Sequence, residues 1–223
     1  MLVTVDEETG MYGAFALEGG LLQGKTLLNL DSEAEGELYV GCAGGVDTTA
    51  KFAYTPVEVE EGDVAVKVSV TGCKGGHSGC DIHLQRANAN KLLFRFLKEA
   101  VANYEARLAS VEGGSLRNAI PREASAIITI PAEGLDEVMD LVAEFEDLFV
   151  AEYDGVEDNI RFMAEQVECP ATELPEDVQD FLIHAITACP HGVYRVIPEM
   201  PDVVETSNNL AMLKTEDNCV IVY

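Results

Sequence analysis

The sequence predicts an α/β segment followed by a larger α+β domain, and two observations support this division. Residues 1–45 contain apolar runs spaced like a strand, a helix and a second strand, which is typical of a parallel sheet. Residues 46–223 contain segments that alternate apolar and polar side chains, together with three amphipathic helical stretches, which is typical of an antiparallel sheet with helices on one face. The glycines of "CAGG", at 42–45, fit the junction between the two regions.

Each region yields a definite set of expected elements. In the first region we expect strands at 2–5 and 26–30 and a helix at 9–18. In the second we expect strands at 50–59, 63–72, 106–111, 124–130, 159–167, 203–213 and 218–223. The expected helices are 82–102, 134–153 and 175–189, the last beginning at Pro175.

Charge and cysteine content exclude several classes of function. Forty acidic residues against 14 basic ones give a net charge of −26, so a nucleic acid or an anionic membrane would be repelled. No run of 18 apolar residues is present, so we expect no membrane span. The first residues lack the basic start of a signal peptide, and the six cysteines are scattered. These features favour free thiols and a cytoplasmic location.

Both ends of the sequence are apolar runs with high strand propensity. The chain opens on "LVTV" and closes on "CVIVY", whereas complete domains usually begin and end in polar residues. We therefore expect an internal segment of a longer protein, with the second domain incomplete at its C-terminus.

Carboxylates follow both expected strands of the first region. Asp6, Glu7 and Glu8 come after the strand at 2–5, and Asp31 comes after the strand at 26–30. Strand ends at one sheet edge are where α/β proteins bind ligands, and hard oxygen donors suit divalent cations. The alternative for the first cluster is an acidic first turn stabilised by the helix dipole.

The sequence "TGCKGGHSGCDIH", at 71–83, raises the question of what His77 does in a glycine-rich loop. A catalytic imidazole is one interpretation, because small neighbours leave it room to approach a substrate. A surface histidine without a role is another. The third is a structural zinc site, since four residues are spaced C-x3-H-x2-C-x2-H: Cys73, His77, Cys80 and His83.

Five motifs taken together resemble the aminoacyl-histidine dipeptidases (Xaa-His dipeptidases), in the family that includes carboxypeptidase G and aminoacylase. In order along the chain they are "VTVDEETGMYGA", "LLNLDSEAEGELYVGCAGG", "GCKGGHSGCDIHLQRANANKLL", "GGSLRNAIPREA" and "VVETSNNLA". The resemblance implies a two-metal hydrolase, usually containing zinc, with manganese or cobalt as other candidates. It also implies small peptide substrates, with dipeptides ending in histidine favoured, and a homodimer formed through a lid domain.

The resemblance assigns roles to particular residues. Glu7 becomes the general base that takes a proton from metal-bound water, Glu8 a ligand of one metal and Asp31 a ligand of the other. His77, reaching in from the partner subunit, stabilises the oxyanion, and Asn118 contacts the substrate. The residues that flank Asn118, Arg117 and Arg122, are suited to bind a substrate carboxylate or to neutralise nearby glutamates.

The sequence departs from the family in its metal ligands. The family's other metal-binding residues have no counterpart here, and no His-x-Asp sequence is present. Residues 1–45 are therefore expected to be part of a catalytic domain, residues 46–223 a lid, and the chain alone a poor metal binder with little or no activity. A non-catalytic dimerisation or binding module, with zinc held by Cys73, His77, Cys80 and His83, is the alternative function.

Overall fold

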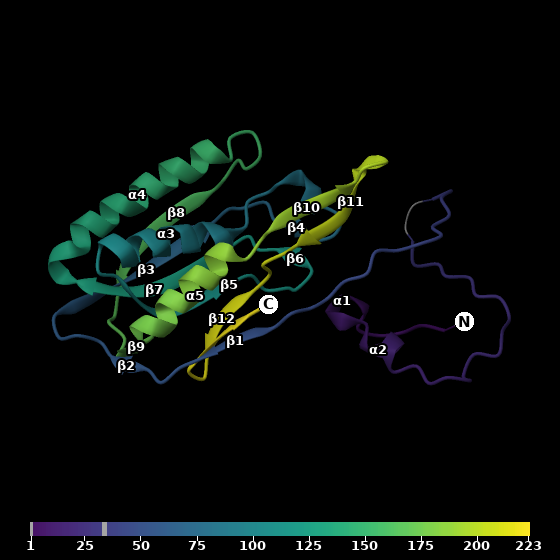
Figure 1. Cartoon of the computed structure of the whole chain (residues 1–223), viewed down its shortest axis with the longest axis horizontal. Coiled ribbons are helices and arrows are strands. Elements are labelled where there is room, and N and C mark those ends of the chain that lie inside the picture. Colours follow the sequence, from purple (N-terminus) through teal and green to yellow (C-terminus); the bar gives the residue numbers. More distant parts are fainter. Residues whose placement is uncertain (1, 33–34) are drawn as a thin grey trace. The chain divides into compact units, whose positions relative to one another are not determined.

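The computed structural model describes residues 2–32 and 35–223, apart from the side chains of Glu8 and Thr9. The chain divides into two compact units, residues 1–46 and residues 47–223. Figure 1 follows the elements along the chain by colour.

The described part of the first unit contains two single-turn helices and no strand, so the strands expected at 2–5 and 26–30 are wrong for this structure. The helices are α1 (Glu7–Gly10) and α2 (Tyr12–Phe15). They divide the helix expected at 9–18, because Met11 between them has φ = 58°.

The exposure of apolar side chains explains why these strands do not form. A strand gains stability from a hydrogen-bonded neighbour and from burial of its side chains. In the first unit Val3 is 75% exposed, Leu28 is 80% exposed and Leu30 is 88% exposed. The apolar runs have the composition of strands, but the described residues of this unit supply no pairing strand. The expected parallel sheet is therefore not confirmed.

The second unit is built on a seven-stranded sheet in which every pair is antiparallel, as predicted. The spatial order is β1-β13-β12-β5-β7-β3-β8, so β1 and β8 are the two edges. The strands are β1 (Ala50–Ala53), β3 (Asp63–Thr71), β5 (Arg107–Gly113), β7 (Ala124–Pro131), β8 (Arg161–Val167), β12 (Leu213–Glu216) and β13 (Cys219–Val222).

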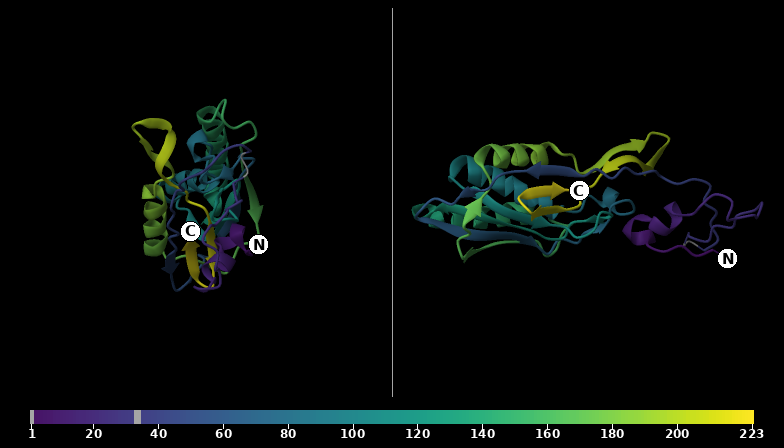
Figure 2. Two further views of the ribbon diagram at one scale, coloured as in Figure 1. Left: turned by 90° about the vertical axis from the view of Figure 1, so that its right-hand side faces the viewer. Right: turned by 90° about the horizontal axis from the view of Figure 1, so that it is seen from below.

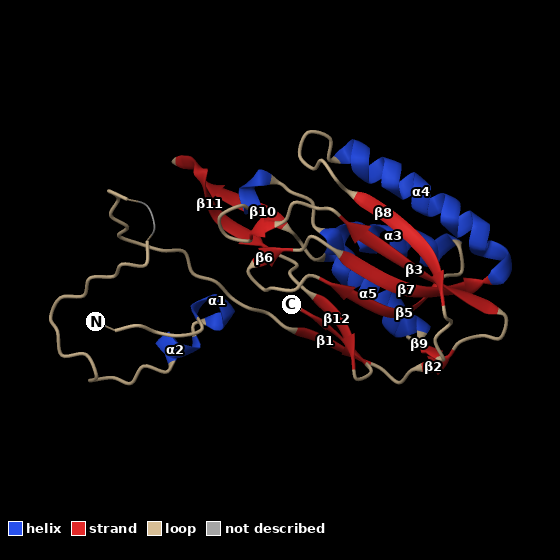
Figure 3. Cartoon of the chain, turned by 180° about the vertical axis from the view of Figure 1, so that it is seen from behind, coloured by secondary structure: helices blue, strands red, loops and turns tan. Residues whose placement is uncertain are grey.

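Three helices cover one face of this sheet, and Figure 3 shows the opposite face, which they leave open. They are α3 (Ala89–Asn103), α4 (Leu135–Glu152) and α5 (Glu176–Ala188). The alternation of β3 follows this arrangement, because Val66, Val68 and Val70 are fully buried in the core. Lys67 and Ser69 point the other way and line a cavity on the open face.

Helix α3 begins seven residues later than the sequence predicts. Residues Ile82–Leu84 form a short 3-10 turn, and Gln85 then takes φ = 54°, which ends that turn. The helix starts only after Asn88, whose side chain accepts a hydrogen bond from the backbone N–H of Lys91. Asn88 is therefore an N-cap, a preference that apolar periodicity does not reveal.

Three two-stranded ribbons complete the second unit. They are β2 (Val57–Glu58) with β9 (Thr172–Glu173), β4 (Gly76–His77) with β6 (Ala119–Ile120), and β10 (Gly192–Ile197) with β11 (Met200–Asn208). The β10–β11 hairpin projects from the body of the unit, as the right panel of Figure 2 shows. The single strand expected at 203–213 is therefore wrong, because Met200–Asn208 and Leu213–Glu216 belong to different sheets.

Candidate functional site

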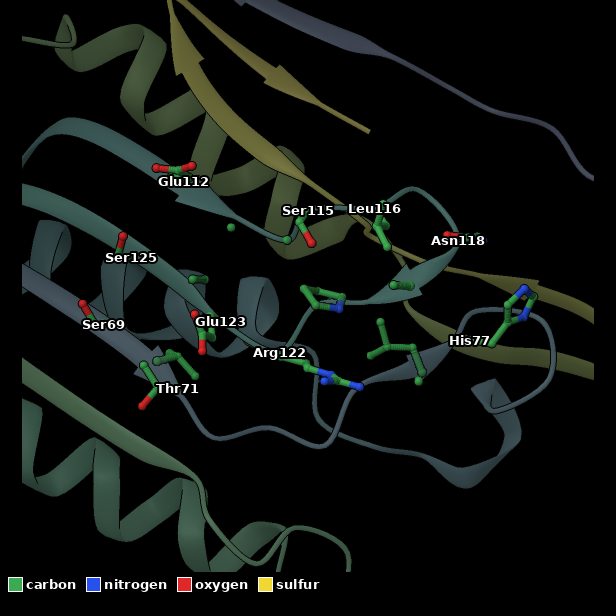
Figure 4. A pocket seen from close by; sticks show the side chains of 18 of the residues that line it. Ser69, Thr71, His77, Glu112, Ser115, Leu116, Asn118, Arg122, Glu123 and Ser125 are labelled. Atoms are coloured by element: carbon green, nitrogen blue, oxygen red, sulfur yellow. The ribbon is translucent and has the colours of Figure 1, made fainter. Parts of the chain in front are cut away.

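The open face of the sheet carries a cavity of about 940 Å³ with many polar groups around it. Its floor comes from β3, β5 and β7, and its rim comes from β4, β6 and the connections beside them. The labelled polar side chains in Figure 4 include Ser69, Thr71, His77, Glu112, Ser115, Asn118, Arg122, Glu123 and Ser125. A concave polar surface of this size is suited to a small-molecule ligand.

His77 lies at the rim of this cavity with an exposed side chain. Its Nδ1 atom accepts hydrogen bonds from the backbone N–H groups of Gly79, at 3.0 Å, and Cys80, at 3.1 Å. A neutral imidazole nitrogen that accepts carries no proton, so the ring proton of His77 is on Nε2. The loop therefore presents an Nε2–H donor rather than a base.

Asn118 and Arg122 line the same cavity as His77. The backbone carbonyl of Asn118 accepts a hydrogen bond from Ser78, and β4 pairs with β6, so the loops of His77 and Asn118 are held together. Arg122 crosses beneath the glycine-rich loop, where a Cβ atom on Gly75 would lie 2.5 Å from its Cγ. The structure thus brings together three of the residues that the sequence singles out.

Arg117 is directed elsewhere. It forms an ion pair with Asp47 at 3.4 Å, and its guanidinium carbon lies 4.8 Å from the ring centre of Tyr223. It is absent from the lining of the cavity that contains Asn118. Its assignment to substrate binding stays a prediction, whereas Arg122 is already at the cavity.

The carboxylates of the predicted metal site belong to the first unit. Glu7 opens α1 and is exposed, and Asp31 is exposed with its backbone N–H bonded to the side chain of Asn29. The side chain of Glu8 lies outside the described part of the structure. Because residues 26–30 form no strand, Asp31 does not lie at a strand tip as the sequence predicted.

Within the part of the chain that the structure describes, no three His, Cys, Asp or Glu side chains are close enough to share a metal ion. The zinc site proposed from Cys73, His77, Cys80 and His83 is therefore wrong. Cys73 is 5% exposed and packs in the core, where burial and then the charge of Glu157 raise its pKa to about 12.

Two charged residues beside the loop escaped the sequence interpretation. Asp81 and Arg86 contact the backbone on either side of Gly76, through bonds to His77 and Gly75. The only sequence signal was that charged residues directly follow a glycine-rich segment. The alternation in 63–72 did indicate a polar sheet face, but it gave no sign of a cavity there.

The second unit is thus an α+β domain, with helices on one face of its antiparallel sheet and a polar cavity on the other face. Residues 68–157 match the family model of the peptidase dimerisation domain, M20_dimer. This part of the chain is therefore similar to the dimerisation domain of M20 peptidases.

Two proteins similar to this chain are named dipeptidases. The whole chain is 40% identical to the cytosol non-specific dipeptidase of Escherichia coli K12, of which it covers 46%. It also matches the crystal structure of aminoacylhistidine dipeptidase from Vibrio alginolyticus, at 46% identity and a TM-score of 0.85, over 98% of this chain and 45% of that one. The resemblance to aminoacyl-histidine dipeptidases is confirmed, and the chain spans about half the length of these relatives.

Proposed function

We propose that the protein containing this chain is a dipeptidase whose substrate meets the cavity on the open sheet face. The observation that supports this most directly is the meeting of His77, Asn118 and Arg122 at one cavity. Both relatives are named dipeptidases, one non-specific and one acting on aminoacylhistidine. We favour dipeptides that end in histidine as substrates.

In this proposal His77 stabilises the oxyanion. Attack on a peptide carbonyl puts negative charge on its oxygen, and a positioned N–H donor lowers the free energy of that transition state. The Nε2–H tautomer imposed by Gly79 and Cys80 is the donor form that this role requires. We further propose that His77 serves the active site of the partner subunit in a homodimer.

The other cavity residues bind the substrate. The Asn118 side chain is suited to hydrogen-bond the peptide unit, having both a donor and an acceptor. Arg122 is suited to bind the terminal carboxylate through two parallel N–H···O bonds. Arg117 takes part only if it leaves Asp47 and Tyr223.

Residues 1–45 form part of the catalytic domain in this proposal, with Glu7 as general base and Glu8 and Asp31 as ligands of two divalent ions. Zinc is favoured, and manganese or cobalt are alternatives. The described side chains do not assemble a metal site by themselves, so we derive no step through a metal. The exposed apolar side chains of this unit support its completion by further protein, and we expect the 223-residue chain alone to be nearly inactive.

Replacement of His77 tests this function. In the complete protein, His77→Ala should lower kcat/KM for an Xaa-His dipeptide about a hundredfold, the usual effect of losing one oxyanion donor. His77→Gln, which retains an N–H donor, should lose less. His184→Ala, an exposed change on α5 away from the cavity, is the control. Unchanged turnover in His77→Ala would contradict the proposal.

For the dimer, we propose contact through the edge strand β8 and the adjoining face of α4. Met139, Ala143 and Val150 of α4 are exposed and share one helix face by their spacing of four and seven residues. Glu146 of the same face forms a 3.0 Å ion pair with Arg161 of β8, so this apolar face adjoins the edge of the sheet. An open strand edge beside apolar side chains is suited to pairing with a second copy.

A double change on this face tests the dimer. Met139→Asp with Val150→Asp should weaken dimerisation about thirtyfold or more, because two apolar contacts become buried charges. Light scattering across a concentration series measures the dissociation constant. Val203→Asp on the β10–β11 hairpin, a similarly exposed apolar residue, is the control. Equal dissociation constants for both variants would exclude this face.

Among the described residues, no helix has the length and apolar character needed to cross a bilayer. The name of the relative from Escherichia coli, a cytosol dipeptidase, supports our proposal of a cytoplasmic location.

A further inference from the structure

We propose that Asp81 and Arg86 are positioning residues that hold the His77 imidazole at the cavity rim as an Nε2–H donor. The inference rests on the proposed function of His77 and adds two residues to it. Neither residue lines the cavity, so any effect on hydrolysis must act through the loop.

Asp81 closes the His77 loop through two hydrogen bonds in opposite directions. Its Oδ2 atom accepts from the backbone N–H of His77 at 2.9 Å, and its own backbone N–H donates to the His77 carbonyl at 2.9 Å. The segment between them contains Gly79 and Cys80, whose N–H groups fix the tautomer of the ring. If this turn opens, the imidazole is therefore free to move, and its proton is no longer confined to Nε2.

Arg86 holds the other side of the same turn. Its Nη1 atom donates to the carbonyl of Gly75 at 2.6 Å and lies 3.6 Å from Oδ2 of Asp81. Both side chains are partly buried, with 25% of Arg86 and 33% of Asp81 exposed, so water does not screen this contact fully. Arg86 thus links the backbone before His77 to the carboxylate that binds His77.

Gly76 makes this close approach possible. It has φ = 142°, and a Cβ atom at this position would lie 2.5 Å from Nη1 of Arg86 and 2.7 Å from Oδ2 of Asp81. Only glycine lets two charged groups pack this tightly against the backbone. The glycine-rich sequence thus gives space to the imidazole and also to the pair that positions it.

Nuclear magnetic resonance of the histidine rings tests this role independently of activity. With ¹⁵N-labelled histidine, long-range ¹H–¹⁵N spectra of the neutral rings distinguish a protonated nitrogen from an accepting one. The unmodified protein should show His77 protonated on Nε2 alone. Asp81→Ala should move both His77 nitrogens toward the average of two tautomers, while His83, His184 and His191 report whether the fold is intact.

Activity of the complete protein supplies the second measurement. Asp81→Ala should lower kcat for an Xaa-His dipeptide about ten- to a hundredfold, the range for a misplaced catalytic group, with KM changed less than about twofold. Asp81→Asn retains an oxygen acceptor and should lose less. Asp158→Ala is the matched control, because it removes an exposed carboxylate that pairs with Lys74 of the same loop region.

The outcomes separate the two proposals. An Asp81→Ala protein with intact reporter histidines and an unchanged His77 tautomer overturns the positioning role. If Asp81→Ala does not fold, Arg86→Ala decides, because it removes the hydrogen bond to Gly75 and the contact with Asp81. An unchanged His77 spectrum and kcat in Arg86→Ala overturn the positioning role equally. Full hydrolysis by His77→Ala overturns the function of His77, while the spectra still decide whether Asp81 positions the ring.

Discussion

Phe96→Ala is expected to lower the free energy of unfolding of the second unit by about 4 kcal/mol, in the range for a fully buried phenylalanine. Phe96 of α3 has no exposed surface, and its ring centre lies 5.0 Å from that of Phe162 in β8 and 5.6 Å from that of Phe145 in α4. The substitution removes two edge-on aromatic contacts and leaves a cavity where two helices and the sheet meet.

Urea denaturation followed by circular dichroism measures this loss. The midpoint should fall while the dependence on urea concentration stays constant, since the surface exposed on unfolding hardly changes. Phe181→Ala is the matched control, because Phe181 is 66% exposed and its ring centre lies 5.9 Å from that of Phe52. A loss below about 1 kcal/mol for Phe96→Ala would mean that the aromatic cluster does not hold the helices to the sheet.

Elements that bury one face within the second unit could be predicted from the sequence. The helix expected at 134–153 forms as Leu135–Glu152, and the strand expected at 63–72 forms as Asp63–Thr71. In both, the period of the apolar residues matches the face that meets the core. Local pattern and tertiary contact agree there, so the sequence alone was sufficient.

Strand prediction from the sequence fails where the formation of a strand depends on contacts with other segments. The run at 26–30 is apolar enough for a strand, but in the described structure its side chains stay exposed and it pairs with nothing. Strand β10 was missed and the bounds of β11 were wrong, because almost all of this hairpin is exposed and it lacks a buried face to create a pattern. Hydrophobic periodicity reports burial, and it cannot identify a strand that forms without burial.

The candidate site was predicted in its residue types but not in its geometry. The motifs identified His77, Asn118 and Arg122, which the cavity brings together. They could not show that Asp81 accepts a hydrogen bond from His77, because that contact depends on the positive φ angles of Gly75 and Gly76. The proposed zinc site failed because spacing does not tell which way a cysteine points.

His191, which follows α5, leads to the second large prediction. The carbonyls at the end of this helix are bound by Lys91, whose Nζ donates to those of Ile186, Thr187 and Cys189. The Nδ1 atom of His191 lies 3.0 Å from the side-chain amide nitrogen of Asn88, which can only donate, so Nδ1 accepts. Burial, and then the charge of Lys91, lower the pKa of His191 to about 4.

A lowered histidine pKa makes the folded state less stable in acid. Between about pH 6.5 and about pH 4 the unfolded chain binds a proton at this ring that the folded protein excludes, so stability falls as the pH falls. A shift from 6.5 to about 4 corresponds to at most about 3 kcal/mol. Above about pH 7 both states are neutral at this ring, and the contribution is constant.

Comparison with His191→Gln separates the contribution of the His191 ring to stability from that of the many carboxylates that titrate in the same pH range. Glutamine can still accept from Asn88 but does not titrate, so the stability of the unmodified protein should fall relative to the variant by about 2 to 3 kcal/mol between about pH 7 and about pH 4. Urea denaturation at each pH gives both curves, with His184→Gln as the control for an exposed imidazole. Parallel curves for the unmodified protein and His191→Gln would contradict a lowered pKa of His191 in the folded protein.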